Sequence, residues 1–169
     1  MEKIGLFYGK SARKTSLVAE ILAEKIGKEK VDLIPVENAS KEDLNPYKYL
    51  IMGGATWFDG ELPSYWDEIL PDVETLSMKG KKVAIYGLGD QASYPENFVD
   101  SIGLLANLVK HCGGEIVGYT STEGYEYERS QAEEDGKFMG LALDFENQEA
   151  LNEKRISDWV AQIIKEFGI

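Results

Sequence analysis

The loop at residues 9–15 combines the residue types that bind an anion. Three of its residues are cationic and two carry a hydroxyl group, and it reads Gly9-Lys10-Ser11-Ala12-Arg13-Lys14-Thr15. This basic loop runs directly into a helical apolar pattern, and the free N–H groups and positive dipole at a helix start favour a negative ligand. A phosphate site is one interpretation, and a solvated turn is the other. The G-x-x-x-x-G-K-[ST] pattern of a nucleoside triphosphate loop is not met, because the second glycine is absent.

Two further polar loops carry aromatic residues. The tryptophan loop (residues 54–62) contains Trp57 and Phe58, and the tyrosine loop (residues 87–98) contains Tyr94. Such side chains either cover the core or stack on a planar ligand, an arrangement that aromatic faces favour. Beside a phosphate site, they indicate a mononucleotide that is held by both its ring and its phosphate. Acidic residues of the same loops would set a negative field around that ring: Asp59, Glu61 and Asp90.

The three loops follow strand-like segments in a chain where strands and helices alternate. Buried strands are predicted at residues 3–8, 30–36, 47–53, 81–87 and 115–120, and amphipathic helices at 15–27, 63–70, 96–111 and 148–167. This alternation predicts one domain over residues 1–169, with a doubly wound α/β fold and a five-stranded parallel sheet. The acidic segment 120–137 is too long for a simple connection and is interpreted as an insertion in the last strand, which resumes at 138–143. In such sheets ligands bind beyond the carboxyl ends of the strands, where all three loops lie.

The composition excludes several classes of function. The chain has 18 Lys and Arg against 30 Asp and Glu, a net charge of −12, which argues against nucleic-acid binding. The single cysteine, Cys112, provides neither a disulfide nor a multi-cysteine metal site, and no acidic spacing resembles a metal-binding loop. The apolar runs are shorter than the roughly 18 residues of a membrane span, and we expect no leader before the first strand. We expect a cytoplasmic protein.

Several other conspicuous residues are assigned to structure. Trp66 and Trp159 lie on helical apolar stripes and are predicted to be in the core. Cys112 is predicted to be a buried structural thiol. His111 stands at a helix end, where a cation favours the negative terminus of the dipole. No catalytic residue is predicted.

Short motifs along the whole chain occur in an order that resembles the long-chain flavodoxins. The similarity runs from Lys3 to the C-terminus, and its most specific parts are Ile4-Gly-Leu-Phe-Tyr-Gly9, Thr56-Trp57 with Gly60-Glu61-Leu62, Gly87-x-Gly89-Asp90-Gln91 with Tyr94, and Gly140-Leu-Ala-Leu-Asp144. The segment 120–137 matches the insertion that defines the long-chain group. The resemblance implies a flavodoxin-like sheet of order 2-1-3-4-5, one non-covalently bound FMN, and one-electron transfer at low potential.

The resemblance also assigns residues to the cofactor. Trp57 and Tyr94 would flank the isoalloxazine ring, with Tyr94 the more coplanar of the two. The Phe58-Asp59 and Asp59-Gly60 peptides would lie near flavin N5, N–H groups around Gly89 would meet the pyrimidine edge, and residues 10–15 would hold the phosphate. The predicted cofactor-binding set is Lys10, Ser11, Ala12, Arg13, Lys14, Thr15, Thr56, Trp57, Phe58, Asp59, Gly60, Gly87, Gly89, Asp90, Tyr94 and Asn97.

The basic loop departs from the phosphate loop of the family, which reads Thr/Ser-x-Thr-Gly-x-Thr. Lys10, Ala12 and Arg13 replace two hydroxyls and the glycine. We hypothesise that Coulomb attraction replaces the lost hydrogen bonds, which would make FMN affinity sensitive to salt. A second departure is Phe58-Asp59 in place of Asn-Ile, and the charge of Asp59 would disfavour the anionic, fully reduced flavin.

The function that the resemblance implies is a carrier of single electrons between redox proteins. The acidic charge would steer basic partner surfaces toward the exposed flavin edge. The family suggests a ferredoxin/flavodoxin-NADP reductase as partner, photosystem I in a photosynthetic host, and a monomeric carrier. Two alternatives stay open: an NAD(P)H-dependent flavin or quinone reductase on the same fold, and a flavin-free binding module.

Overall fold

The computed structural model describes residues 2–57 and 59–169. The main sheet has six parallel strands, and five of them lie in the order β2-β1-β3-β4-β5. Their bounds are Ile4–Tyr8 (β1), Val31–Pro35 (β2), Tyr49–Ala55 (β3), Lys82–Leu88 (β4) and Glu115–Val117 (β5). This order confirms the predicted flavodoxin-like sheet.

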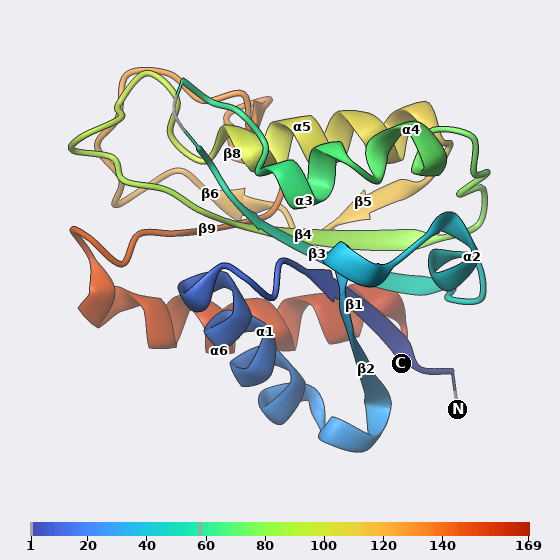
Figure 1. The fold of residues 1–169 in the computed structure, drawn as a ribbon. Helices are drawn as coiled ribbons and strands as arrows, with labels where there is room; N and C mark the ends of the chain where they lie inside the picture. The colour runs from blue at the N-terminus through green and yellow to red at the C-terminus, as the bar shows by residue number, and fades with distance from the viewer. Residues whose placement is uncertain (1, 58) are drawn as a thin grey trace.

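Helices cover both faces of the sheet (Figure 1). One face carries α1 (Arg13–Ile26) and α6 (Glu149–Phe167), and the other carries α3 (Ser64–Asp67), α4 (Leu70–Val73) and α5 (Asp100–His111). The short α2 (Lys41–Leu44) begins with the capping box of Ser40 and Asp43, and two 3₁₀ turns flank β2, η1 at Lys28–Lys30 and η2 at Val36–Asn38.

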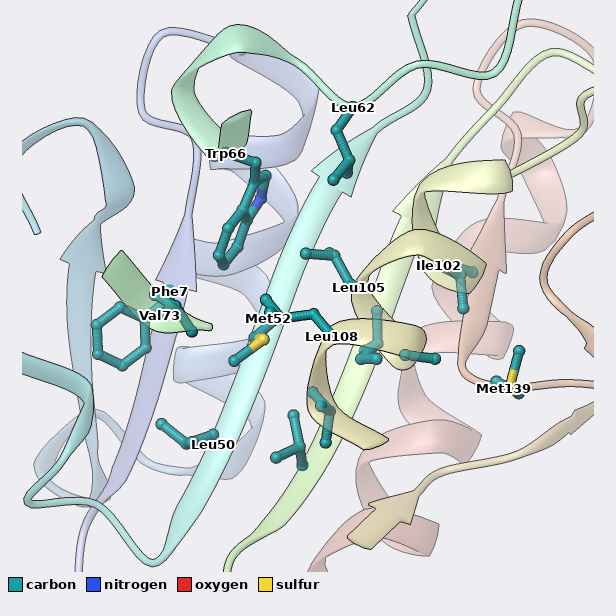
Figure 2. Close-up of a cluster of buried hydrophobic side chains, with 14 of the residues drawn as sticks. Phe7, Leu50, Met52, Leu62, Trp66, Val73, Ile102, Leu105, Leu108 and Met139 are labelled. Atoms are coloured by element: carbon teal, nitrogen blue, oxygen red, sulfur yellow. The ribbon is translucent and has the colours of Figure 1, made fainter. Parts of the chain in front are cut away.

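The sheet separates two hydrophobic clusters, because its central strands bury side chains on both faces. Figure 2 shows the cluster beneath the helices α3 to α5, where Met52 of β3 faces Leu105 of α5 and Trp66 closes the end near Leu62. Trp159 belongs to the cluster beneath α1 and α6, and both tryptophans are buried as predicted. Cys112 is buried too, and burial raises the pKa of its thiol.

The edge strand is divided in two. β4 pairs with β5 along Lys82–Ala84 and with β9 (Leu141–Leu143) along Tyr86–Leu88. The chain between them forms a small antiparallel sheet of order β6-β8-β7, which comprises Thr120–Ser121, Lys137–Phe138 and Glu133–Glu134. The predicted insertion is confirmed. The strand resumes at Leu141 and not at Phe138, because Phe138 pairs with Thr120 and Glu133 in the small sheet.

Some predicted helices have different bounds. The helix predicted over 63–70 is two short helices, α3 and α4, because Pro71 has no N–H with which to continue the first. The helix predicted from residue 96 begins at Asp100, since Val99 before it takes the left-handed conformation with φ 47°. None of the helices in the described part of the chain is long and apolar enough to cross a membrane.

Candidate functional site

A cavity of about 460 Å³ opens at the carboxyl ends of the strands. It joins the basic loop, the tryptophan loop, the tyrosine loop and the chain after β9, and its lining residues are Ala12, Arg13, Lys14, Thr15, Ala55, Thr56, Leu88, Gly89, Asp90, Tyr94, Phe145 and Glu146. Eight of these are predicted cofactor-binding residues. The three loops therefore meet at the predicted edge of the sheet.

The start of α1 presents free hydrogen-bond donors to this cavity. Ala12, the N-cap, supplies no side-chain cap, and the first turn has no acidic residue. Among the described residues no acceptor binds the N–H groups of Arg13, Lys14 or Thr15. Thr15 is 1% exposed, and its Oγ1 has no hydrogen-bond partner in the described part of the chain. A buried hydroxyl without a partner costs free energy, so this end of the cavity is suited to an acceptor such as phosphate.

Tyr65 of α3 packs against the same end. A Cβ on Gly9 would lie 2.2 Å from its ring, so the glycine permits this contact. Burial raises the pKa of Tyr65 to about 12, although the Ala55 backbone and the Thr15 side chain both lower it. The hydroxyl is thus near Thr15, yet the two form no hydrogen bond of standard geometry. Both hydroxyls remain available to a ligand.

The side chain of Lys14 is paired across the cavity. Its Nζ lies 2.6 Å from Glu146 Oε1 and 5.7 Å from the centroid of the Phe145 ring. This contact connects α1 with the chain after β9. Phe145 and Glu146 are not among the predicted site residues, although a loop after the last parallel strand must reach the same edge of the sheet.

The first half of the basic loop is held by a residue that the sequence analysis also missed. Glu37, in the η2 turn after β2, accepts hydrogen bonds from the N–H groups of Lys10 (3.0 Å) and Ser11 (2.8 Å) and from Ser11 Oγ (2.8 Å). Burial raises the pKa of this carboxyl, and the donors from Ser11 and Lys10 outweigh that effect, so that the pKa lies below its usual value. Glu37 is therefore ionised at neutral pH.

Two aromatic residues lie exposed at the rim. Tyr94 is 52% exposed and lines the cavity, and Trp57 is 38% exposed. Trp57 exchanges two backbone hydrogen bonds with Glu61, at 2.8 and 2.7 Å, around the left-handed Gly60 (φ 87°). Its ring meets that of Tyr65 edge-on at 6.1 Å. Exposed aromatic surface next to a cavity is suited to a planar ligand.

The tryptophan loop and the tyrosine loop are tied together. Asn97 Nδ2 donates to the Asp59 carbonyl and to Asp100 Oδ2, each at 3.2 Å. The N–H of Thr56 donates to the Leu88 carbonyl at 3.1 Å. These contacts fix the rim of the cavity from both sides.

Two carboxylates hold the tyrosine loop and the chain after β9. Asp144 is 0% exposed and accepts five hydrogen bonds, two from Gln91, two from Asn147 and one from the Glu146 N–H. Asp90 Oδ1 accepts from Asn147 Nδ2 at 2.8 Å. Burial raises the pKa of each carboxyl, but the hydrogen bonds outweigh burial, so both pKa values lie below the usual range. Both groups add negative charge beside the cavity.

Not all predicted residues line the cavity. Outside its lining lie Lys10, Ser11, Trp57, Asp59, Gly60, Gly87 and Asn97. A Cβ on Gly87 would lie 2.6 Å from Ile102 Cγ1, so packing against α5 explains this glycine. Cofactor contact by these residues stays a prediction, and Phe58 lies outside the described residues.

A larger groove of about 630 Å³ lies between the tryptophan loop and α5. Its polar lining includes Glu61, Asp67 and Glu74, and none of the three cations of the basic loop reaches it. This charge disfavours an anionic ligand there. The smaller cavity is therefore the candidate site.

The fold and the cavity define the class of protein. It is a doubly wound α/β protein whose site, at the carboxyl edge of a parallel sheet, offers anion donors at one end and exposed aromatic rings at the other.

Comparison with known proteins identifies the family. The family model of flavodoxin matches residues 6–159. A flavodoxin of Nostoc sp. is 47% identical over 168 residues, covering 99% of both chains. Flavodoxin 1 of Escherichia coli is 37% identical over 166 residues, covering 98% of this chain and 94% of the relative. The crystal structure of Fusobacterium nucleatum flavodoxin bound to flavin mononucleotide has a TM-score of 0.93 and 38% identity, with 98% of this chain and 99% of that chain covered. The chain belongs to the flavodoxin family, as the resemblance to its long-chain members implied.

Proposed function

We propose that this chain binds one FMN non-covalently in the cavity and carries single electrons between redox proteins. The observation that carries the proposal is the buried, unpartnered Oγ1 of Thr15 beside the uncapped N–H groups of α1. A phosphate group would satisfy these donors. The relatives support the cofactor, since the Fusobacterium nucleatum flavodoxin was solved bound to flavin mononucleotide.

Each end of the cavity would hold a different part of the cofactor. The N–H groups at the start of α1 and the Thr15 hydroxyl would hold the phosphate, with Lys10 and Arg13 adding positive charge. Tyr94 and Trp57 would contact the ring, and Asn97 would orient the Asp59 carbonyl beside it. Bound flavin supplies the redox chemistry, because it accepts and releases electrons one at a time.

The charges of the chain favour a low reduction potential. Asp90 and the buried Asp144 are both held ionised beside the tyrosine loop. Negative groups disfavour any further negative charge placed near them, because like charges repel. A cofactor at this site would therefore give up an added electron readily.

Redox proteins are the partners of this family, and the finer assignments follow from charge. A net charge of −12 would attract basic surfaces. We infer a ferredoxin/flavodoxin-NADP reductase as one partner, photosystem I as another if the host is photosynthetic, and a monomer acting in the cytoplasm. The two alternative functions, a reductase and a flavin-free module, gain no support from relatives that match the full chain and are named flavodoxin.

The test is a comparison of FMN with riboflavin, which lacks the phosphate. The purified protein should be yellow, and the apoprotein should bind FMN far more tightly than riboflavin. Thr15→Val removes the buried hydroxyl and keeps the shape, so FMN affinity should fall by about tenfold while riboflavin affinity stays the same. Ser16→Ala, one residue along α1, is the matched control. A chain that binds neither ligand would overturn the proposed function.

A further inference from the structure

We propose that Glu37 is a positioning residue for the cofactor phosphate, because its carboxylate holds the first half of the basic loop in the conformation that binds the phosphate. The proposal rests on the proposed FMN site. It assigns a role to a residue of the η2 turn that lies outside the cavity lining.

The geometry joins two neighbouring strand ends. Glu37 follows β2, and the basic loop follows β1, which pairs with β2 along its whole length. The two carboxylate oxygens divide the donors between them: Oε1 accepts from the Lys10 N–H, and Oε2 accepts from both the N–H and the hydroxyl of Ser11. The neighbouring Val36 is 2% exposed, so the turn that carries Glu37 is fixed to the core.

This contact divides the donors of the loop into two groups. The N–H groups of Lys10 and Ser11 are bound by Glu37, and the Ala12 N–H closes a turn on the Gly9 carbonyl at 3.3 Å. The donors of Arg13 to Thr15 are left for a ligand. Hydrogen bonds to an ionised carboxylate are stronger than those between neutral groups, so Glu37 is suited to hold this shape.

Electrostatics alone predicts the opposite role. Glu37 places a negative charge next to the basic loop, which would bind a phosphate dianion. Because like charges repel, this charge should weaken phosphate binding. If repulsion dominated, removal of the charge would tighten FMN binding. If positioning dominates, as we propose, removal weakens it. The sign of the change therefore separates the two roles.

The experiment measures the dissociation constants of FMN and riboflavin for the apoprotein of the wild type and of Glu37→Gln. We expect FMN to bind about tenfold more weakly to E37Q and riboflavin to bind within twofold of wild type. Ser11→Ala, which removes only the hydroxyl bond, should show a smaller loss for FMN. Glu42→Gln is the charge control, because Glu42 is exposed on α2 and its side chain has no hydrogen bond to another described residue.

Each outcome is decisive. Tighter or unchanged FMN binding by E37Q would overturn the proposal, and so would an equal loss for FMN and riboflavin, which would indicate general damage to the site. Riboflavin binding by E37Q shows that the ring end of the site is folded. Failure of the wild type to bind FMN would instead overturn the proposed function.

Discussion

The two ends of the cavity are built in different ways. At the phosphate end the N–H groups at the start of α1 are uncapped, the Thr15 hydroxyl is buried, and Glu37 and Glu146 bind the loop that carries these donors. At the ring end Tyr94 and Trp57 stand exposed, and their loops are held by the Asp90 and Asp144 carboxylates, the Asn97 amide and backbone contacts. Affinity at the first end should come from charge and hydrogen bonds, and at the second from apolar contact. The difference implies that salt, phosphate and ring substitutions act on separate parts of the binding energy.

The largest expected effect is on stability and comes from Asp144, which supports both ends of the cavity. Asp144 connects the tyrosine loop with the chain after β9 through Gln91 and Asn147, so Asp144→Asn should lower the free energy of unfolding by about 3 kcal/mol. The folded pKa of Asp144 is lowered, so its stabilisation is present above the unfolded value of 3.8 and is lost as pH falls through the folded pKa. Urea unfolding between pH 7 and pH 2 measures this.

The control is Asp158→Asn, since within the described residues the interaction of the Asp158 side chain is an exposed ion pair with Lys154. Its cost should stay below about 1 kcal/mol. Equal costs for the two substitutions would show that Asp144 does not connect the two ends.

An intermediate effect isolates the ring end. Tyr94→Ala removes apolar and stacking contact worth about 2 kcal/mol, so FMN and riboflavin should both bind about thirtyfold more weakly. Tyr94→Phe retains the ring and should restore most of the affinity. Fluorescence titration measures both ligands. A loss confined to FMN would contradict the division of the cavity into two ends.

The smallest expected effect is on the salt dependence of FMN affinity, which reports on the charge at the phosphate end. The double substitution Lys10→Thr with Arg13→Gly removes two cations and restores a family-like loop. FMN affinity of the wild type should fall more steeply with salt than that of the variant, since screening acts on exposed charges. Titrations between 10 mM and 500 mM salt, roughly a sevenfold range of Debye length, would show it. The same slope for both chains would contradict the Coulomb hypothesis.

The strands of the sheet and the loops at its carboxyl edge could be predicted from the sequence, because local residue patterns determine them. Apolar strands buried on both faces predicted the sheet, the resemblance to the long-chain flavodoxins supplied its order, and the carboxyl-edge rule brought the three loops to one cavity. The prediction failed at two helix boundaries. At Pro71 the missing N–H divides a predicted helix into two short ones, and at Val99 the left-handed backbone delays the start of α5. Glu37 and Glu146 could not be found from spacing, since they lie 26 and 132 residues from their partners Ser11 and Lys14. Only the strand order brings those pairs together.

The divided edge strand also bears on self-association. A long, flat outer strand exposes a row of N–H and C=O groups to which another molecule can add its own strand. Here that side of the sheet ends in β5 and β9, which have 3 residues each and are separated by the acidic insertion. So short and interrupted a border gives a second copy little on which to extend the sheet at this edge.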